Sequence, residues 1–243
     1  MIRLTAEYCQ RFFIQNPNHH AVSISLNDGR GFCECDRCRR LDAGGLRMEG
    51  ADPETGAAGK LPVITDRVIT FANQVAAAVA RTHPDKKILL FAYGLYKDPP
   101  QRVQVHPNLI IQYTMHANGH RDPAAAAKEF DELAKWSKAA SQLAVYEYFV
   151  QGHMPDLPRL FPGAVAESVR RLHAMGYRYY ETQAGDGYAL NGLTYYLLAR
   201  LLWDPGRDAA EIQRDYFEKG FGRAAPAVSR YFSRLAERYR IHY

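Results

Sequence analysis

Apolar segments of strand type alternate with helical segments through most of this 243-residue chain. A mostly apolar run, KILLFAYGLY, occupies residues 87–96, and the helical pattern AAAAKEFDELAKWSKAA occupies residues 124–140. The periodicity predicts strands at 21–27, 87–96, 109–115, 142–149 and 177–182. Strands that alternate with helices form βαβ units, so the sequence predicts a parallel sheet.

The predicted helices have recognisable ends in the sequence. The first helix breaks at Asn16-Pro17-Asn18, and a second begins at Asp66 and ends before His83-Pro84-Asp85. Further helices are expected at 164–176, at 193–203 and at 209–240, the last interrupted near Gly220 to Pro226. Residues 41–62 are rich in Gly, Ala, Asp and Pro, which predicts an exposed loop.

An eight-stranded (β/α) barrel needs roughly 250 residues of continuous repeats. Five strands and a helical tail therefore predict an α/β fold, a partial or complete TIM-like (β/α) barrel with a C-terminal helical segment. Residues 1–190 would form the C-terminal part of such a barrel. Residues 191–243 would form helices packed on it.

Polar residues follow the predicted strands where each strand ends. Carboxylates at strand ends serve general acid/base chemistry, and glycoside hydrolysis needs two of them. We therefore expect three catalytic carboxylates, Asp28, Glu147 and Glu181. We expect sugar to contact Asn27, Tyr93, His116, Tyr146 and Tyr148. The alternative is that these are ordinary surface residues or helix-capping partners.

Three cysteines follow the first strand with C-x-C-x-x-C spacing, Cys33, Cys35 and Cys38. They are one thiolate short of a closed tetrahedral zinc site, and Cys9, Asp36 or a histidine would have to supply the fourth ligand. Reduced, packed cysteines or one disulfide with a remaining thiol are the alternatives. No local base accompanies these thiols, so a structural role, with or without zinc, is favoured over thiol catalysis. The predicted chemistry requires no cofactor.

Composition excludes several kinds of partner. The net charge of +5 is modest, and no basic run has the density of a nucleic-acid-binding patch. No segment has the apolar length of a membrane span, and the first residues lack the apolar core of a signal peptide. We therefore expect a carbohydrate partner and neither nucleic acid nor a membrane.

The segment SLNDGRGFCECDRC resembles the "NDG…FCxCxxC" signature of the domain-of-unknown-function 4838 family, part of which is classed as glycoside hydrolase family 163. Further blocks resemble the family in the same order: FANQVAAAVARTHPDKKILLFAYG, AVYEYF, HMPDLPRLFP, LLARLLWDP and FGRAAPAVSRYF. The resemblance covers nearly the whole chain.

The resemblance implies a TIM-barrel-like glycosidase fold. For the characterised members it implies endo-β-N-acetylglucosaminidase activity by a retaining mechanism that the acetamide of the substrate assists. Full members carry earlier barrel strands, so the strand before Asp28 would be the fourth and the strand with Glu147 the seventh. If the chain is a fragment, the resemblance implies a secreted or periplasmic protein.

Three functions follow, in order of preference. The first is a glycoside hydrolase that acts on glycans or polysaccharides. The second is a non-catalytic carbohydrate-binding or truncated barrel module. The third is a metal-dependent hydrolase that uses Cys33, Cys35 and Cys38, ranked last because three thiolates suit a structural site better than an open catalytic one.

Overall fold

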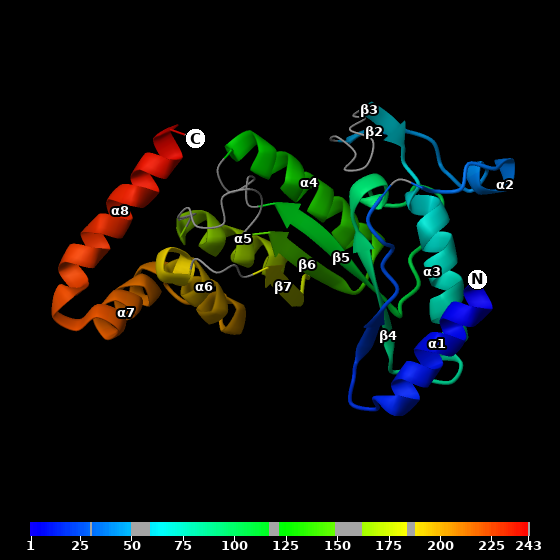
Figure 1. Cartoon of the computed structure of the whole chain (residues 1–243), viewed down its shortest axis with the longest axis horizontal. Coiled ribbons are helices and arrows are strands. Elements are labelled where there is room, and N and C mark those ends of the chain that lie inside the picture. The colour runs from blue at the N-terminus through cyan, green and yellow to red at the C-terminus, as the bar shows by residue number, and fades with distance from the viewer. Residues whose placement is uncertain (30, 50–58, 117–121, 149–161, 184–187, 243) are drawn as a thin grey trace. The chain divides into compact units, whose positions relative to one another are not determined.

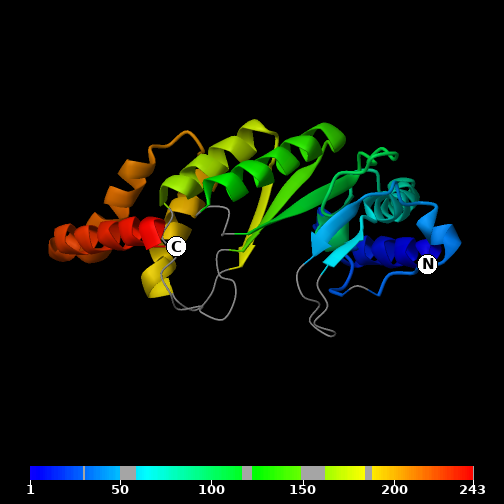
Figure 2. The same cartoon turned by 90° about the horizontal axis from the view of Figure 1, so that it is seen from above.

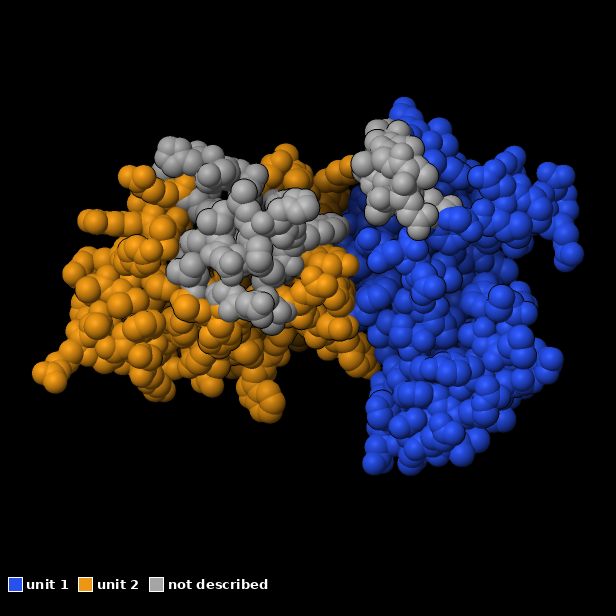
Figure 3. All heavy atoms as spheres, in the orientation of Figure 1, with its two compact units in different colours: residues 1–114, 132–145 blue, residues 115–131, 146–243 orange. Residues whose placement is uncertain are grey.

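The computed structural model describes residues 1–29, 31–49, 59–116, 122–148, 162–183 and 188–242. The chain divides into two compact units (Figure 3). Unit 1 consists of residues 1–114 and 132–145, and unit 2 consists of residues 115–131 and 146–243. The predicted division at residue 190 stays a prediction.

Five strands of the described chain form one parallel, curled half-barrel sheet, which confirms the predicted α/β fold (Figure 1). They pair in chain order, β1 (Ala21–Ser23), β4 (Lys87–Ala92), β5 (Leu109–His116), β6 (Leu143–Tyr148) and β7 (Tyr179–Gln183). Val22 lies opposite Ile88 in the β1–β4 ladder, and Leu90 lies opposite Ile111 in the β4–β5 ladder. Parallel neighbours need long crossovers, and helices supply them.

The helices lie close to where the periodicity places them. The longer ones are α1 (Ile2–Gln15), α3 (Thr65–Ala80), α4 (Pro123–Ala139), α5 (Pro162–Ala174), α6 (Tyr188–Trp203), α7 (Ala209–Phe221) and α8 (Ala225–His242). Short turns form α2 (Asp36–Arg39), η1 (Gly94–Tyr96) and η3 (Gly222–Ala224). The expected break after α7 falls at Gly222, whose φ of +50° favours glycine. Among the described helices, none combines the length and apolarity that a bilayer crossing demands.

Strand β1 is shorter than the predicted 21–27 because a side-chain oxygen replaces a backbone carbonyl in its hydrogen-bond ladder with β4. The backbone N–H of Ile24 still donates to the carbonyl of Leu89 at 3.0 Å. The next bond goes to a side chain, since the N–H of Phe91 donates to Ser25 Oγ at 3.0 Å. A hydroxyl that replaces a backbone carbonyl ends the regular pairing.

The prediction of an exposed loop over 41–62 is wrong for residues 46–49 and 59–62. Strands β2 (Leu46–Glu49) and β3 (Gly59–Pro62) pair there as an antiparallel hairpin. The composition of the segment does not indicate this pairing, because the pairing depends on contacts with residues outside the segment. Arg47 of β2 forms an ion pair with Asp98 at 2.5 Å, and the N–H of Val63 donates to the carbonyl of Gly45. The tip, residues 50–58, lies outside the described residues.

Unit 1 has its core where α1 packs beside α3 (Figures 1 and 2). Both helices carry apolar residues at helical spacing, so each buries one face. The buried side chains include Cys9, Phe13, Ala72, Val75, Ala76 and Val79. Gln10 adds a polar link, donating to the carbonyl of Ala78 at 3.3 Å and to Thr82 Oγ1 at 3.1 Å.

Unit 2 has two apolar clusters built mainly from its helices. The first joins α5 and α6 to the start of α7 through Val165, Ala166, Val169, Leu197, Leu198, Leu201 and Ile212. The second joins α6, α7 and α8 through Leu193, Phe217, Ala225 and Phe232. Asp208 caps α7, accepting the N–H of Ala210 at 2.7 Å.

Asp66 holds the connection that enters β5. Its side chain is buried at the start of α3, and its carboxylate accepts three backbone N–H groups, from Gln101 at 3.0 Å, Arg102 at 2.7 Å and Val103 at 3.1 Å. Hydrogen bonds to a charged acceptor are stronger than neutral ones. Asp66 therefore fixes a turn whose own residues have no regular secondary structure.

We expect D66A to lower the free energy of unfolding of unit 1 by about 3 kcal/mol, because it leaves three backbone donors without their acceptor. Urea unfolding in a W203F background measures this. Trp136, buried in unit 1 and bonded to the carbonyl of Lys97 at 2.8 Å, is then the sole indole of the chain. The control D85A removes an exposed carboxylate and should stay within about 0.5 kcal/mol of the parent. Equal losses in both variants would contradict the role of Asp66.

A histidine makes the stability of unit 1 depend on pH. Burial, with a smaller contribution from the positive charge of Lys87, lowers the pKa of His106. Its Nδ1 accepts the N–H of Asn108 at 3.1 Å, which requires the neutral ring. Because the folded-state pKa lies below the unfolded value of about 6.5, the unfolded chain binds the proton first. The stabilisation is therefore complete above that value and is lost as pH falls.

We expect unit 1 to lose more unfolding free energy between pH 7.5 and pH 5.5 in the parent than in H106N. The asparagine Oδ1 can still accept from Asn108 but does not titrate. The same Trp136 fluorescence assay measures both proteins, and the other histidines are common to them. Identical pH slopes would show that His106 does not carry this dependence.

Candidate functional site

In unit 1 the predicted strand-end residues gather around Tyr96. Asp28 is exposed beyond β1, Tyr93 is half-buried just after β4, and Tyr96 is buried in η1. Burial raises the pKa of Tyr96 to about 12, and the nearby groups Tyr93 and Asp28 add to the shift. The ring of Phe32 lies edge-on to Tyr96 at 6.3 Å between centroids. Asp28 and Tyr93 therefore share one neighbourhood, next to the exposed Asn27.

In unit 2 the two predicted glutamates have opposite environments. Glu147 of β6 is fully buried, whereas Glu181 of β7 is exposed. The hydroxyl of Thr182 donates to the backbone carbonyl of Glu147 at 3.0 Å, so the ends of β6 and β7 are adjacent. Asp28 belongs to unit 1 and both glutamates belong to unit 2.

Tyr180 of β7 is a further aromatic residue near Glu147. Its ring packs against the cluster formed by α5 and α6. Burial raises the pKa of Tyr180 well above its usual value, and the negative charge of Glu147 adds to the shift. The Glu147 carboxylate therefore lies within electrostatic reach of the Tyr180 hydroxyl. Sequence reasoning missed Tyr180, because the YRYYET segment offers three tyrosines and no sign of which one faces inward.

Alternation along each strand separates neighbouring side chains, because they point to the two faces of the sheet in turn. Tyr146 and Tyr148 therefore share the face of β6 opposite to Glu147, and Glu181 lies on the face of β7 opposite to Tyr180. The two tyrosine rings lie edge to face with centroids 4.9 Å apart, and both are half-buried.

His116 is the last residue of β5, and its side chain lies outside the described part of the structure. Its expected contact with sugar stays a prediction. The same holds for the catalytic and sugar-binding roles of the other strand-end residues.

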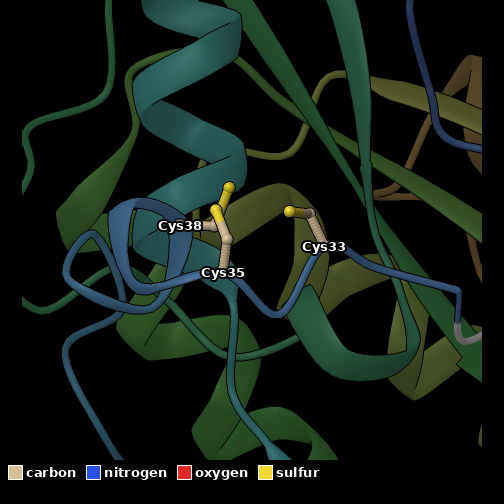
Figure 4. A group of neighbouring side chains, drawn as sticks. All are labelled: Cys33, Cys35 and Cys38. Carbon is tan, nitrogen blue, oxygen red and sulfur yellow. The ribbon is translucent and has the colours of Figure 1, made fainter.

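The thiols of Cys33, Cys35 and Cys38 gather beside the start of α3, each Sγ within 4.8 Å of the others (Figure 4). This cluster could bind a metal ion. Neither Cys9 nor Asp36 belongs to it, since the described group consists of these three cysteines alone. Cys9 is instead buried in α1. None of the four cysteines forms a disulfide in this structure, and Cys33 and Cys35 are exposed.

Hydrogen bonds give two thiols of this cluster different pKa values. The backbone N–H of Cys38 is the main group that lowers the pKa of Cys35, to about 7, and the thiols of Cys33 and Cys38 contribute. Hydrogen bonds with Cys33 and then Cys35 raise the pKa of Cys38 to about 11. Cys35 is therefore the thiol that ionises most readily of this pair.

Arg67 of α3 ties the cysteine loop to the body of unit 1. Its Nη1 donates to the carbonyl of Cys33 at 2.6 Å. Its Nε donates to Asp42 Oδ1 at 2.9 Å, and its Nη2 bonds the second oxygen of that carboxylate. The hydrogen bond to Asp42 is the main cause that raises the pKa of Arg67. No local sequence pattern indicates this pair, because 25 residues separate its members.

Comparison with known proteins gives one family. The family model described as "Domain of unknown function (DUF4838)" matches residues 1–233. Neither the curated proteins nor the solved structures contain a match.

We expect R67M to release the cysteine loop, because the variant removes the bond to Cys33 and leaves the carboxylate of Asp42 unpartnered by Arg67. Trypsin should then cut after the exposed Arg37, Arg39 and Arg40 about tenfold faster, since each charge-assisted bond contributes roughly 1.5–3 kcal/mol. Mass spectrometry of the timed digest measures the rate. R81M, an exposed change at the other end of α3, is the control, and equal rates in both variants would refute the anchoring role.

Proposed function

Because the chain belongs to the family described as "Domain of unknown function (DUF4838)", whose description states no activity, we propose a function from its own residues and from the resemblance to glycoside hydrolase family 163. The chain is a glycoside hydrolase of the kind found in glycoside hydrolase family 163. It acts on glycans or polysaccharides that contain N-acetylhexosamine, as an endo-β-N-acetylglucosaminidase with a retaining mechanism that the substrate acetamide assists.

One observation carries this proposal: the exposed Glu181 lies on β7, and the neighbouring strand β6 carries the tyrosine pair Tyr146 and Tyr148. Sugar rings stack their C–H faces on aromatic rings, and a carboxyl group beside them can reach the glycosidic oxygen. Glu181 is thus the best placed of the three acids to transfer a proton. Tyr146 and Tyr148 would hold the sugar.

Within unit 2, Glu147 completes the proposed acidic pair. It would stabilise the oxocarbenium-like transition state or orient the acetamide, and His116 would add a contact to sugar. In unit 1, the exposed Asp28 stays a proposed catalytic acid, with Asn27 and Tyr93 as proposed sugar contacts. The reaction requires no cofactor, because carboxylates alone move the proton.

A second candidate is a non-catalytic carbohydrate-binding module. The complete burial of Glu147 favours it, because a carboxylate without exposed surface cannot meet a substrate unless its cover moves. In this second candidate Glu147 is a buried structural residue of β6, and Glu181 with the tyrosine pair binds sugar without cutting it.

We expect E181Q to lower turnover of an aryl β-glycoside of N-acetylglucosamine or of its β-1,4 dimer by at least about 1,000-fold while sugar affinity changes little, because the amide cannot donate a proton. Initial rates and calorimetric titration measure the two quantities. The control E211Q changes an exposed glutamate on α7 and should keep full activity.

The outcomes separate the two candidates. An active parent whose E181Q variant keeps its turnover would contradict the role of Glu181. A parent that binds the sugars without cleaving them would overturn the hydrolase and support the binding module. E147Q adds a further test: a loss of turnover at unchanged thermal stability supports catalysis by Glu147, and a fall in stability alone supports its structural role.

A further inference from the structure

The cysteine cluster after β1 is not used by the proposed hydrolase, yet its three thiols converge. Each Sγ lies within 4.8 Å of the other two, and Figure 4 shows Cys33 and Cys38 turned toward a common space. Tetrahedral zinc with bonds of about 2.3 Å to sulfur needs sulfur atoms about 3.8 Å apart. The three sulfur atoms therefore lie at most about 1 Å farther apart than such a site needs.

The backbone around Cys35 already has the turn that a C-x-x-C metal loop needs. The N–H groups of Cys38 and Arg39 both donate to the carbonyl of Cys35 at 3.0 Å.

Basic side chains lie close to the cluster, among acidic ones. Three thiolates and one divalent cation leave a net charge of −1, which requires nearby compensation. The guanidinium of Arg67 lies within electrostatic reach of Cys33 and Cys38 and holds the loop through the carbonyl of Cys33. Arg37 and Arg40 are exposed on the same short segment, and Arg39 is paired with Glu34 at 2.9 Å.

We propose that Cys33, Cys35 and Cys38 bind one zinc ion in a structural site that pins the loop between β1 and α3. Thiolates at C-x-x-C spacing are typical zinc ligands, and the third cysteine comes from the same loop. Among the described residues no fourth donor joins the group, so a solvent molecule completes the tetrahedron. The ion would fold this loop onto Arg67 and α3, and it would take no part in proton transfer at Glu181.

The test uses the whole chain, purified under reducing conditions, depleted with a chelator and titrated with zinc chloride. We expect one zinc per chain, measured by plasma mass spectrometry, and an X-ray absorption spectrum with three sulfur neighbours and one oxygen. Cobalt(II) in place of zinc should give a sulfur-to-cobalt charge-transfer band that falls by about a third in each of C33S, C35S and C38S. Zinc affinity should fall by at least about 100-fold in each variant.

C9A is the matched control, because Cys9 is the one cysteine outside the cluster. Unchanged zinc content in C9A supports the assignment, and loss of zinc there without unfolding would overturn it. Zinc should also slow tryptic cleavage after Arg37, Arg39 and Arg40, a readout that does not depend on glycosidase activity. These experiments can therefore refute the zinc site without refuting the proposed hydrolase function. They can also support the zinc site when the hydrolase function is refuted.

Four further results would overturn the proposal. The first is a reduced parent that binds no zinc. The second is iron or copper in place of zinc at full occupancy. The third is four sulfur neighbours, which would mean a ligand from a second chain or from elsewhere. The fourth is a disulfide between two of the three thiols that the reducing agents of the assay do not open. Alkylation followed by mass spectrometry detects such a disulfide in the purified protein before reduction.

Discussion

Parallel pairing of the strands is the constraint on which the rest of the structure depends. A parallel ladder cannot be closed by a tight turn, so a long crossover must return the chain after each strand. Helices α3, α4 and α5 occupy such crossovers, and their apolar faces supply much of the core. The same geometry places the end of one strand beside the end of the next. In unit 1 this brings Asp28 near Tyr93, and in unit 2 it brings Glu147 beside Thr182.

The first turn of α3 organises the irregular segments of unit 1. Asp66 accepts three backbone N–H groups of the segment before β5, while the adjacent Arg67 holds Asp42 and the carbonyl of Cys33. Neighbouring residues of opposite charge thus hold two different loops. Arg102 adds a link between those loops, since its guanidinium donates to the backbone carbonyls of Arg40 and Asp42. This explains how short, polar loops keep a defined conformation around the cysteine cluster.

The burial of each residue matters more to the proposed chemistry than its place at a strand end. Glu147 and Glu181 both lie near the ends of neighbouring strands, and both were expected to act on substrate. The structure separates them, because Glu147 is fully buried and Glu181 is exposed to solvent. This exposure, on the strand next to the tyrosine pair of β6, is why the proposal gives proton transfer to Glu181.

The sequence by itself determined the order and type of the main elements. Periodicity is a local property, so the five sheet strands, the long helices and the break at Gly222 follow from residues that are close along the chain. The cysteine cluster was also visible, because its three members lie within six residues. Only the tertiary structure decided the β2–β3 hairpin, the Arg67–Asp42 pair and the burial of Glu147. Each of these depends on partners distant in sequence, and no local pattern records which distant groups will meet.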